Sequence, residues 1–252
     1  MDKKTIIQAK HLKKSFGKGD SLQTIYSDLN VDIYEGDFTV IMGSSGAGKS
    51  TLMYSLSGMD KPDGGEIDFA GTDITKLTSD KLAVFRRDKC GFVFQQIYLI
   101  DKMSLMDNVI TAGVLTSKDK ADIVKRAKEL FGLVNIPENT QKKMPSLISG
   151  GEAQRAGIVR AVINNPKVLF ADEPTGALNS ANSAAVLDVF SSLHKKGQSI
   201  VMVTHDKKSA LRGSRILYIK DGQIFGECDL GNYSEDPERT AKFEAFITEM
   251  GW

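Results

Sequence analysis

The sequence lacks the features that mark membrane-spanning, secreted and nucleic-acid-binding proteins. It has no run of about 18 apolar residues, and its N-terminus leads into a strand-like segment without the apolar stretch of a signal peptide. Only two cysteines occur, Cys90 and Cys228, without metal-binding or redox spacing, so we expect reduced thiols. The 33 basic and 32 acidic residues leave a net charge of +1, which disfavours a nucleic-acid partner. We therefore expect a cytoplasmic chain that does not itself cross a membrane.

The most informative stretch is a glycine-rich loop between an apolar run and a helix-like segment. It consists of Gly43, Ser44, Ser45, Gly46, Ala47, Gly48, Lys49, Ser50 and Thr51. The glycines let backbone N–H groups surround an anion, and the following helix start adds partial positive charge. Lys49 can reach the β and γ phosphates of a nucleotide, Ser50 is placed to ligate Mg²⁺, and Thr51 extends the first turn. A chance match in a glycine-rich turn is the alternative, which the strand, loop, helix order disfavours.

Three strand-like runs elsewhere in the chain end in polar side chains. In α/β proteins the ends of strands carry ligand groups. Gln95 could touch Mg²⁺ or the attacking water, and His205 could donate a hydrogen bond to a γ-phosphate oxygen. Asp172 would hold Mg²⁺ through water, and Glu173 would polarise the attacking water. The alternatives are a polar cap on a buried strand, a solvated acidic loop and a structural histidine.

Two further segments could contact a nucleotide. Phe16 precedes the glycine loop by a segment long enough to fold back over it, so its ring could stack on a base; the alternative is a buried aromatic at a strand end. Ser149 can cap a helix whose first turn holds Gly150, Gly151 and Glu152, which predicts a second anion-binding helix start. One nucleotide does not need two such starts, so this pattern suggests a dimer; the alternative is an ordinary serine cap.

The periodicity predicts an α/β fold. Residues 5–12, 29–34 and 66–69 alternate in strand fashion and favour an antiparallel β layer, whereas residues 97–160 show helical periodicity and predict an inserted helical lobe. We expect residues 1–252 to form one large domain with this lobe inserted. Apolar residues at helical spacing near the end of the chain predict a docking helix: Phe243, Phe246, Ile247 and Met250.

Together, in this order and context, the motifs resemble those of the ATP-binding-cassette (ABC) ATPases. Phe16 is similar to the adenine-stacking aromatic, residues 43–50 to the Walker A loop, Gln95 to the Q-loop, residues 148–152 to the signature, Asp172 and Glu173 to the Walker B pair, and His205 to the switch histidine. The resemblance implies a P-loop NTPase with a RecA-like core sheet, an antiparallel β layer and an inserted helical subdomain. It also implies hydrolysis of ATP with Mg²⁺ held by Ser50, Gln95 and Asp172.

The resemblance further implies the partners of the chain. Two copies would sandwich two ATP molecules, each between the Walker A loop of one subunit and Ser149, Gly150 and Gly151 of the other. A separate membrane permease would contact a groove beside Gln95 and the helical lobe, and would hold the chain on the inner face of the cell membrane. The group that this chain resembles contains macrolide exporters, lipoprotein-release and cell-division ATPases, and bacitracin-type peptide-resistance transporters, and Thr175-Gly176-Ala177-Leu178 favours the last.

Two rival interpretations and two departures from the family pattern remain. A soluble ABC protein acting on nucleic acid or ribosomes would commonly carry a second cassette, coiled coil or zinc-bearing insertion, and none is evident in the sequence. A non-hydrolysing regulatory cassette is disfavoured by the intact Glu173 and His205. The signature has Ile148 and Glu152 where the family usually has Leu and Gln, and Asn179 stands where the D-loop usually has Asp, which puts the coupling between two nucleotide sites in doubt.

Overall fold

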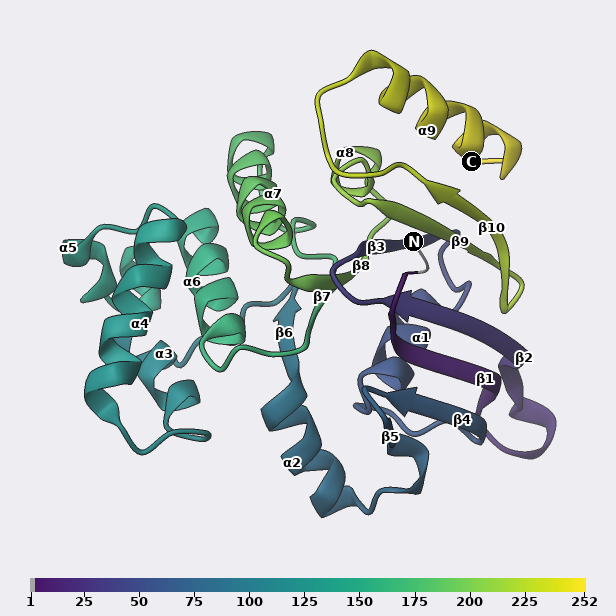
Figure 1. Ribbon diagram of the computed structural model, residues 1–252, viewed down its shortest axis with the longest axis horizontal. Coiled ribbons are helices and arrows are strands. Elements are labelled where there is room, and N and C mark those ends of the chain that lie inside the picture. Colours follow the sequence, from purple (N-terminus) through teal and green to yellow (C-terminus); the bar gives the residue numbers. More distant parts are fainter. Residues whose placement is uncertain (1–2) are drawn as a thin grey trace. The chain divides into compact units, whose positions relative to one another are not determined.

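The computed structural model describes residues 3–252, which fall into two compact units. One unit combines the N-terminal part of the chain up to Arg86 with Gly197–Trp252, and the other is Arg87–Lys196. Both contain helices and strands, as Figure 1 shows, so the predicted α/β class is confirmed. Within the described range, no helix is both long and apolar enough to span a bilayer.

An antiparallel sheet opens the first unit. Its strands are β1 (Thr5–Phe16), β2 (Gln23–Tyr34), β4 (Gly64–Phe69) and β5 (Thr72–Asp73), in the order β2-β1-β4-β5. Leu12 pairs with Leu29 and both are buried, because alternate side chains of paired strands point to the same face. The predicted antiparallel layer is confirmed, and its first two strands are longer than the sequence suggested.

The second sheet of this unit carries the glycine-rich loop. Its strands are β3 (Phe38–Gly43), β8 (Ser199–Val203), β9 (Arg215–Lys220) and β10 (Gln223–Asp229), in the order β10-β9-β3-β8. β3 runs parallel to both β8 and β9, and every residue of β3 is buried. This explains its continuous apolar sequence, which is typical of a strand covered on both faces.

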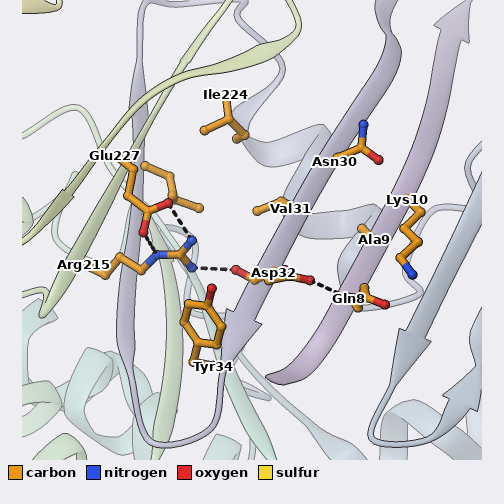
Figure 2. Close-up of a pocket in the computed structure, with 11 residues that line it drawn as sticks. Gln8, Ala9, Lys10, Asn30, Val31, Asp32, Tyr34, Arg215, Ile224 and Glu227 are labelled. Atoms are coloured by element: carbon orange, nitrogen blue, oxygen red, sulfur yellow. Dashed lines mark hydrogen bonds and ion pairs between the residues drawn. The ribbon is translucent and has the colours of Figure 1, made fainter. Parts of the chain in front are cut away.

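A buried arginine joins the two sheets of the first unit beside a polar cavity of about 330 Å³ (Figure 2). Arg215 is only 4% exposed, and its Nε and Nη2 donate to the Glu227 carboxylate at 2.6 and 2.8 Å. Nη1 donates to the carbonyl of Asp32 at 2.5 Å, and the guanidinium lies 4.7 Å from the centre of the Tyr34 ring. A planar guanidinium is suited both to a forked contact with a carboxylate and to stacking on an aromatic ring. Through these contacts, Arg215 links β9 and β10 to β2.

The helices of the first unit are mostly short. They are α1 (Lys49–Leu56), α2 (Ser79–Lys89, which ends in the second unit), α8 (Lys207–Ala210), α9 (Pro237–Glu249) and the 3-10 turns η1 (Gly19–Ser21) and η2 (Ile74–Lys76). α9 buries Phe243, Phe246 and Ile247, so the predicted docking helix is confirmed. It packs against β10, where a side chain at Gly226 would meet Met250 Sδ at 2.5 Å.

The second unit pairs two parallel strands with a group of helices. The strands are β6 (Cys90–Phe94) and β7 (Val168–Asp172), and the helices are α3 (Leu105–Gly113), α4 (Lys120–Leu133), α5 (Glu138–Gln141), α6 (Gly150–Val162), α7 (Ser180–Lys195) and the 3-10 turn η3 (Pro145–Leu147). The predicted helical segment 97–160 lies within this unit, which also includes the two strands and α7. The assignment of the chain as a single domain stays a prediction. Cys90 and Cys228 are both buried, on β6 and β10.

Candidate nucleotide-binding site

The predicted site residues divide between the two units. The glycine-rich loop, Phe16 and His205 belong to the first, and Gln95, Asp172, Glu173, the segment Ser149–Glu152 and Asn179 belong to the second. Each group is described within its own unit.

The loop after β3 is shaped by glycines that no other residue could replace without strain. Gly43 has φ +148° and Gly48 has φ +93°, a region that disfavours side chains. A Cβ on Gly43 would lie 2.2 Å from the carbonyl oxygen of Ile219, and one on Gly48 would lie 2.6 Å from Cγ2 of Ile25. The loop is therefore held between β9 and β2 by close approaches that only glycine allows at these two positions.

The helix that follows the loop begins without a side-chain cap. Gly48 occupies the N-cap position of α1, so no side chain of that residue can satisfy the amides of the first turn. Lys49 Nζ donates to the carbonyls of Gly43 at 2.9 Å and Ser44 at 2.7 Å, which keeps the ammonium over the loop. This arrangement fits a phosphate group, which would accept from the amides and lie against the ammonium.

A cavity of about 550 Å³ adjoins this loop. It is lined by residues 23–27 at the start of β2, residues 44–47 of the loop, and Asp221 and Gly222. Phe16, the last residue of β1, pairs with Gln23 of that lining and is 46% exposed. The alternative of a buried aromatic at this position is therefore wrong. Lys14 Nζ lies 5.0 Å from the centre of the Phe16 ring, so one face of the ring is occupied by a cation.

His205 lies on a short turn between β8 and α8. It is exposed, whereas the preceding Thr204 is fully buried. Thr204 Oγ1 accepts from the amide of Asp206 at 3.0 Å, and Asp206 caps α8 by accepting from the amide of Ser209 at 2.7 Å. The histidine is thus an exposed residue in a turn whose neighbours on both sides are held by hydrogen bonds.

In the second unit, two strand ends bring the other predicted polar residues together. Phe94 of β6 pairs with Asp172 of β7 in parallel register, so Gln95 and Glu173 follow at the same edge. The Gln95 amide lies beside Gly176, where an added Cβ would approach Nε2 to 3.1 Å. This unit therefore presents an amide and two carboxylates at the ends of adjacent strands.

Glu173 has a backbone conformation that the sequence did not predict. Its φ is +46°, a region in which residues other than glycine are uncommon. Such strain persists only where the surrounding structure fixes it, and it is frequent at functional sites. A proline follows at position 174, and neither residue type signals a left-handed conformation in the sequence.

The start of α6 forms a reciprocal capping box. Ser149 Oγ accepts from the amide of Glu152 at 3.3 Å, and Glu152 Oε2 accepts from the amide and hydroxyl of Ser149 at 2.9 and 2.8 Å. The predicted serine cap is confirmed. The hydrogen bond from the Ser149 amide is the leading cause that lowers the pKa of Glu152, so this helix start already carries a carboxylate.

Two polar residues missed in the sequence tie the elements of the second unit together. Gln154 of α6 donates to the carbonyl of Phe94 at 3.0 Å, and Arg160 donates to the carbonyls of Ile97 at 2.7 Å and Tyr98 at 2.5 Å. Burial lowers the pKa of Arg160. The partners of both side chains are backbone carbonyls of a segment that is distant in the sequence. The residue types alone therefore could not predict these hydrogen bonds. The helix that starts at Ser149 thus holds the loop that carries Gln95.

Asn179 is the N-cap of α7. Its Oδ1 accepts from the amide of Asn182 at 3.0 Å. Asn182 in turn packs on the start of α6, since a Cβ on Gly151 would lie 2.4 Å from its Oδ1. An aspartate would cap the helix equally well, so the substitution leaves the local structure intact.

Comparison with known proteins decides the family. A family model described as ABC transporter matches residues 26–176. The chain belongs to the ABC transporter family. An uncharacterised ABC transporter ATP-binding protein of Methanocaldococcus jannaschii is 40% identical over 219 residues, which are 87% of this chain and 97% of that protein. It follows that this ABC chain is an ATPase.

Other relatives are longer than this ABC chain. The macrolide export ATP-binding/permease protein MacB of Mannheimia succiniciproducens is 38% identical over 88% of this chain but only 34% of its own length. Among solved structures, a dimeric ATP-binding cassette in a post-hydrolysis state bound to ADP and Pi is 35% identical, with a TM-score of 0.81, and covers 90% of this chain and 100% of its own. The P-loop NTPase fold is therefore shown, and so is the binding of adenine nucleotide in a close structural relative.

The side chains predicted to ligate Mg²⁺ are few, as expected for an ion that is bound mainly by a nucleotide. Among residues 3–252, no group of three or more His, Cys, Asp or Glu side chains is arranged to hold a metal. By residue type, Ser50 of the first unit offers a hydroxyl, and Gln95 and Asp172 of the second offer an amide and a carboxylate. Mg²⁺ prefers such oxygen ligands in small number together with phosphates and water, so the chemistry of each of these side chains suits the ion.

Proposed function

We propose that two copies of this ATPase close around two ATP molecules and that the closure drives a separate membrane permease. The observation that carries this proposal is that the chain has two dissimilar helix starts, one without a side-chain cap and one capped by an exposed serine. α1 begins at Gly48 behind the glycine loop, and α6 begins at Ser149, which is exposed. The first serves the nucleotide of its own chain, and the second serves the nucleotide of the partner copy.

We infer a division of labour among the site residues. Phe16 stacks on the adenine, and the loop from Gly43 to Thr51 binds the phosphates with Lys49 as its mobile cation. Mg²⁺, held by Ser50, Gln95 and Asp172, neutralises the β and γ phosphate charges when bound. Each of these residues binds or orients and none forms a covalent bond with the nucleotide.

In this proposal, the hydrolysis of ATP depends on two side chains, Glu173 and His205. Glu173 accepts a hydrogen bond from the attacking water and polarises it toward the γ phosphorus. His205 donates to a γ-phosphate oxygen and stabilises the charge that develops there. Ser149, Gly150, Gly151 and Glu152 of the partner copy complete the site and exclude water.

For the permease, we propose an antimicrobial peptide resistance type, supported by Thr175-Gly176-Ala177-Leu178. Macrolide export is the second candidate, which the MacB relatives favour. The chain spans about a third of the length of those relatives. We propose that it acts with a membrane permease, at the cytoplasmic face of the membrane. Co-purification of the tagged chain from its native host, followed by mass spectrometry, tests this; recovery without any membrane protein would contradict it.

The catalytic part of the proposal is tested with Glu173→Gln. The amide keeps the shape of the side chain but cannot polarise the water, so hydrolysis should fall roughly a hundredfold or more. ATP binding should persist, and the ATP-bound dimer should accumulate in size-exclusion chromatography with light scattering. Normal turnover with only monomer present would show that the assignment of Glu173 is wrong.

A further inference from the structure

The C-terminal helix α9 contacts the segment that carries His205. Both belong to the first unit, and Figure 1 shows α8 close to α9. Glu244 on α9 accepts from Lys207 Nζ at 2.8 Å, and Lys207 is the first residue of α8, two positions after His205. One end of α8 is thereby tied to α9.

The other end of α8 is held by a buried arginine. Arg239 is 6% exposed, and its Nη2 donates to the carbonyl of Leu211 at 3.1 Å and to that of Gly213. Its Nη1 donates to the carbonyls of Leu230, at the start of the loop after β10, and Gly231. One guanidinium thus joins the segment after α8 to the loop that leads into α9.

Like Arg160, Arg239 makes no hydrogen bond to a carboxylate of the described residues, and the charge of Asp229 acts on it only at longer range. Throughout the described part of the chain, the hydrogen bonds of Arg239 go to carbonyl oxygens, and its Nε has no partner. The Tyr233 ring lies 5.7 Å from the guanidinium. Burying a cation for packing alone is unfavourable. A planar fork that satisfies carbonyls of two loops is, by contrast, a specific way to fix their relative position.

The spacing of the two contacts matches the segment that they hold. Arg239 and Glu244 are five residues apart on α9, which corresponds to about 7.5 Å along a helix. α8 has four residues, or about 6 Å. The two contacts therefore reach both ends of this single turn of helix. At its start, Asp206 accepts from the amide and hydroxyl of Ser209 at 2.7 Å each, which makes the turn at 204–206 continuous with α8.

We propose that α9 positions His205: Arg239 and Glu244 fix the two ends of α8 and so fix the backbone of the histidine. This rests on the proposed role of His205 in hydrolysis. Both residues are positioning residues, since their hydrogen bonds reach Lys207 and backbone carbonyls of the neighbouring segments. A displacement of about 1 Å at a catalytic group can reduce a rate by up to a hundredfold, so a helix far from the phosphates can govern turnover.

The central test compares two buried arginines of the same unit. Arg239→Met should lower kcat about tenfold with an unchanged Kd for ATP, and hydrogen exchange of the peptide 204–213 should rise. Arg215→Met is the matched control, because Arg215 is equally buried but contacts β2 and β10 instead of α8. It should lower Tm comparably and keep kcat within about twofold. Equal losses of kcat in both variants, or unchanged exchange at 204–213, would overturn the proposal.

The exposed ion pair offers a second test that does not threaten folding. Lys207→Glu and Glu244→Lys should each lower kcat about two- to threefold, the scale of one exposed pair, and the double exchange should restore it. Failure of the double exchange to restore kcat would contradict the contact at this end of α8.

One further variant separates this proposal from the role of the histidine itself. His205→Ala should abolish most hydrolysis, and adding Arg239→Met should cause no further loss of kcat. If His205→Ala hydrolyses ATP normally, the proposed role of His205 is wrong. If it is inactive while Arg239→Met keeps full kcat, only the positioning by α9 is wrong.

Discussion

Substitution of Lys49 tests whether the glycine-rich loop binds phosphate. Its ammonium donates to two carbonyls of its own loop, so it is already placed where the phosphate chain would lie. Lys49→Ala should abolish useful ATP binding, because the loop would lose its mobile cation. Nucleotide titration measures this, with Lys76→Ala as control, since Lys76 is an exposed lysine paired with Asp73. Unchanged affinity in Lys49→Ala would rule out the phosphate loop.

At this scale, the sequence predicted residues whose chemistry is local. The glycine loop, the serine cap and the polar strand ends follow from backbone rules that act over a few residues. The buried hydrogen bonds of Arg160 and Arg239 were not predicted, because charged residues on helices ordinarily face water. Their partners are carbonyls brought close by the tertiary fold. The positive φ of Glu173 was not predicted either, because the surrounding fold and not the residue type imposes that conformation.

At the scale of elements, the start of α6 should depend on pH. The pKa of Glu152 is lowered, chiefly by the hydrogen bond from the Ser149 amide, so its ionised form is favoured by folding. The stability it contributes is present at neutral pH and is lost as the pH falls below about 4.5 toward the lowered value. Glu152→Ala should therefore lower Tm by about 2 °C or less at neutral pH, with a smaller difference in acid.

Differential scanning calorimetry across this pH range measures the effect. Glu152→Gln is the matched control, because its amide oxygen can still accept from the Ser149 amide but does not titrate. A difference between wild type and Glu152→Ala that stays constant from neutral pH into acid would show that the carboxylate does not stabilise this helix start. The strands themselves were predictable as elements from alternating apolar residues in β1, β2 and β4 and from a continuous apolar run in β3, but the lengths of β1 and β2 depend on their pairing partners.

For the whole molecule, the proposed dimer requires an anion at each exposed helix start. Without nucleotide the chain should be mostly monomeric, and in the Glu173→Gln background ATP should raise the dimer fraction. Adding Ser149→Trp should block that shift and spare ATP binding, as measured by light scattering and titration. Ser234→Trp, at another exposed serine, is the control. If Ser149→Trp still dimerises with ATP, the α6 start does not contact the partner's nucleotide.

The pairing of β3 also sets the order in which the protein can become functional during synthesis. β3 lies between β8 and β9, and Phe38 pairs with Ile200 while Gly43 pairs with Ile219. The phosphate loop is therefore translated early but supported by strands that leave the ribosome late, and contacts so distant in sequence form slowly. A nascent chain that ends before β9 should carry the complete loop sequence and still fail to retain ATP. Nucleotide binding should therefore require that synthesis has continued at least through β9.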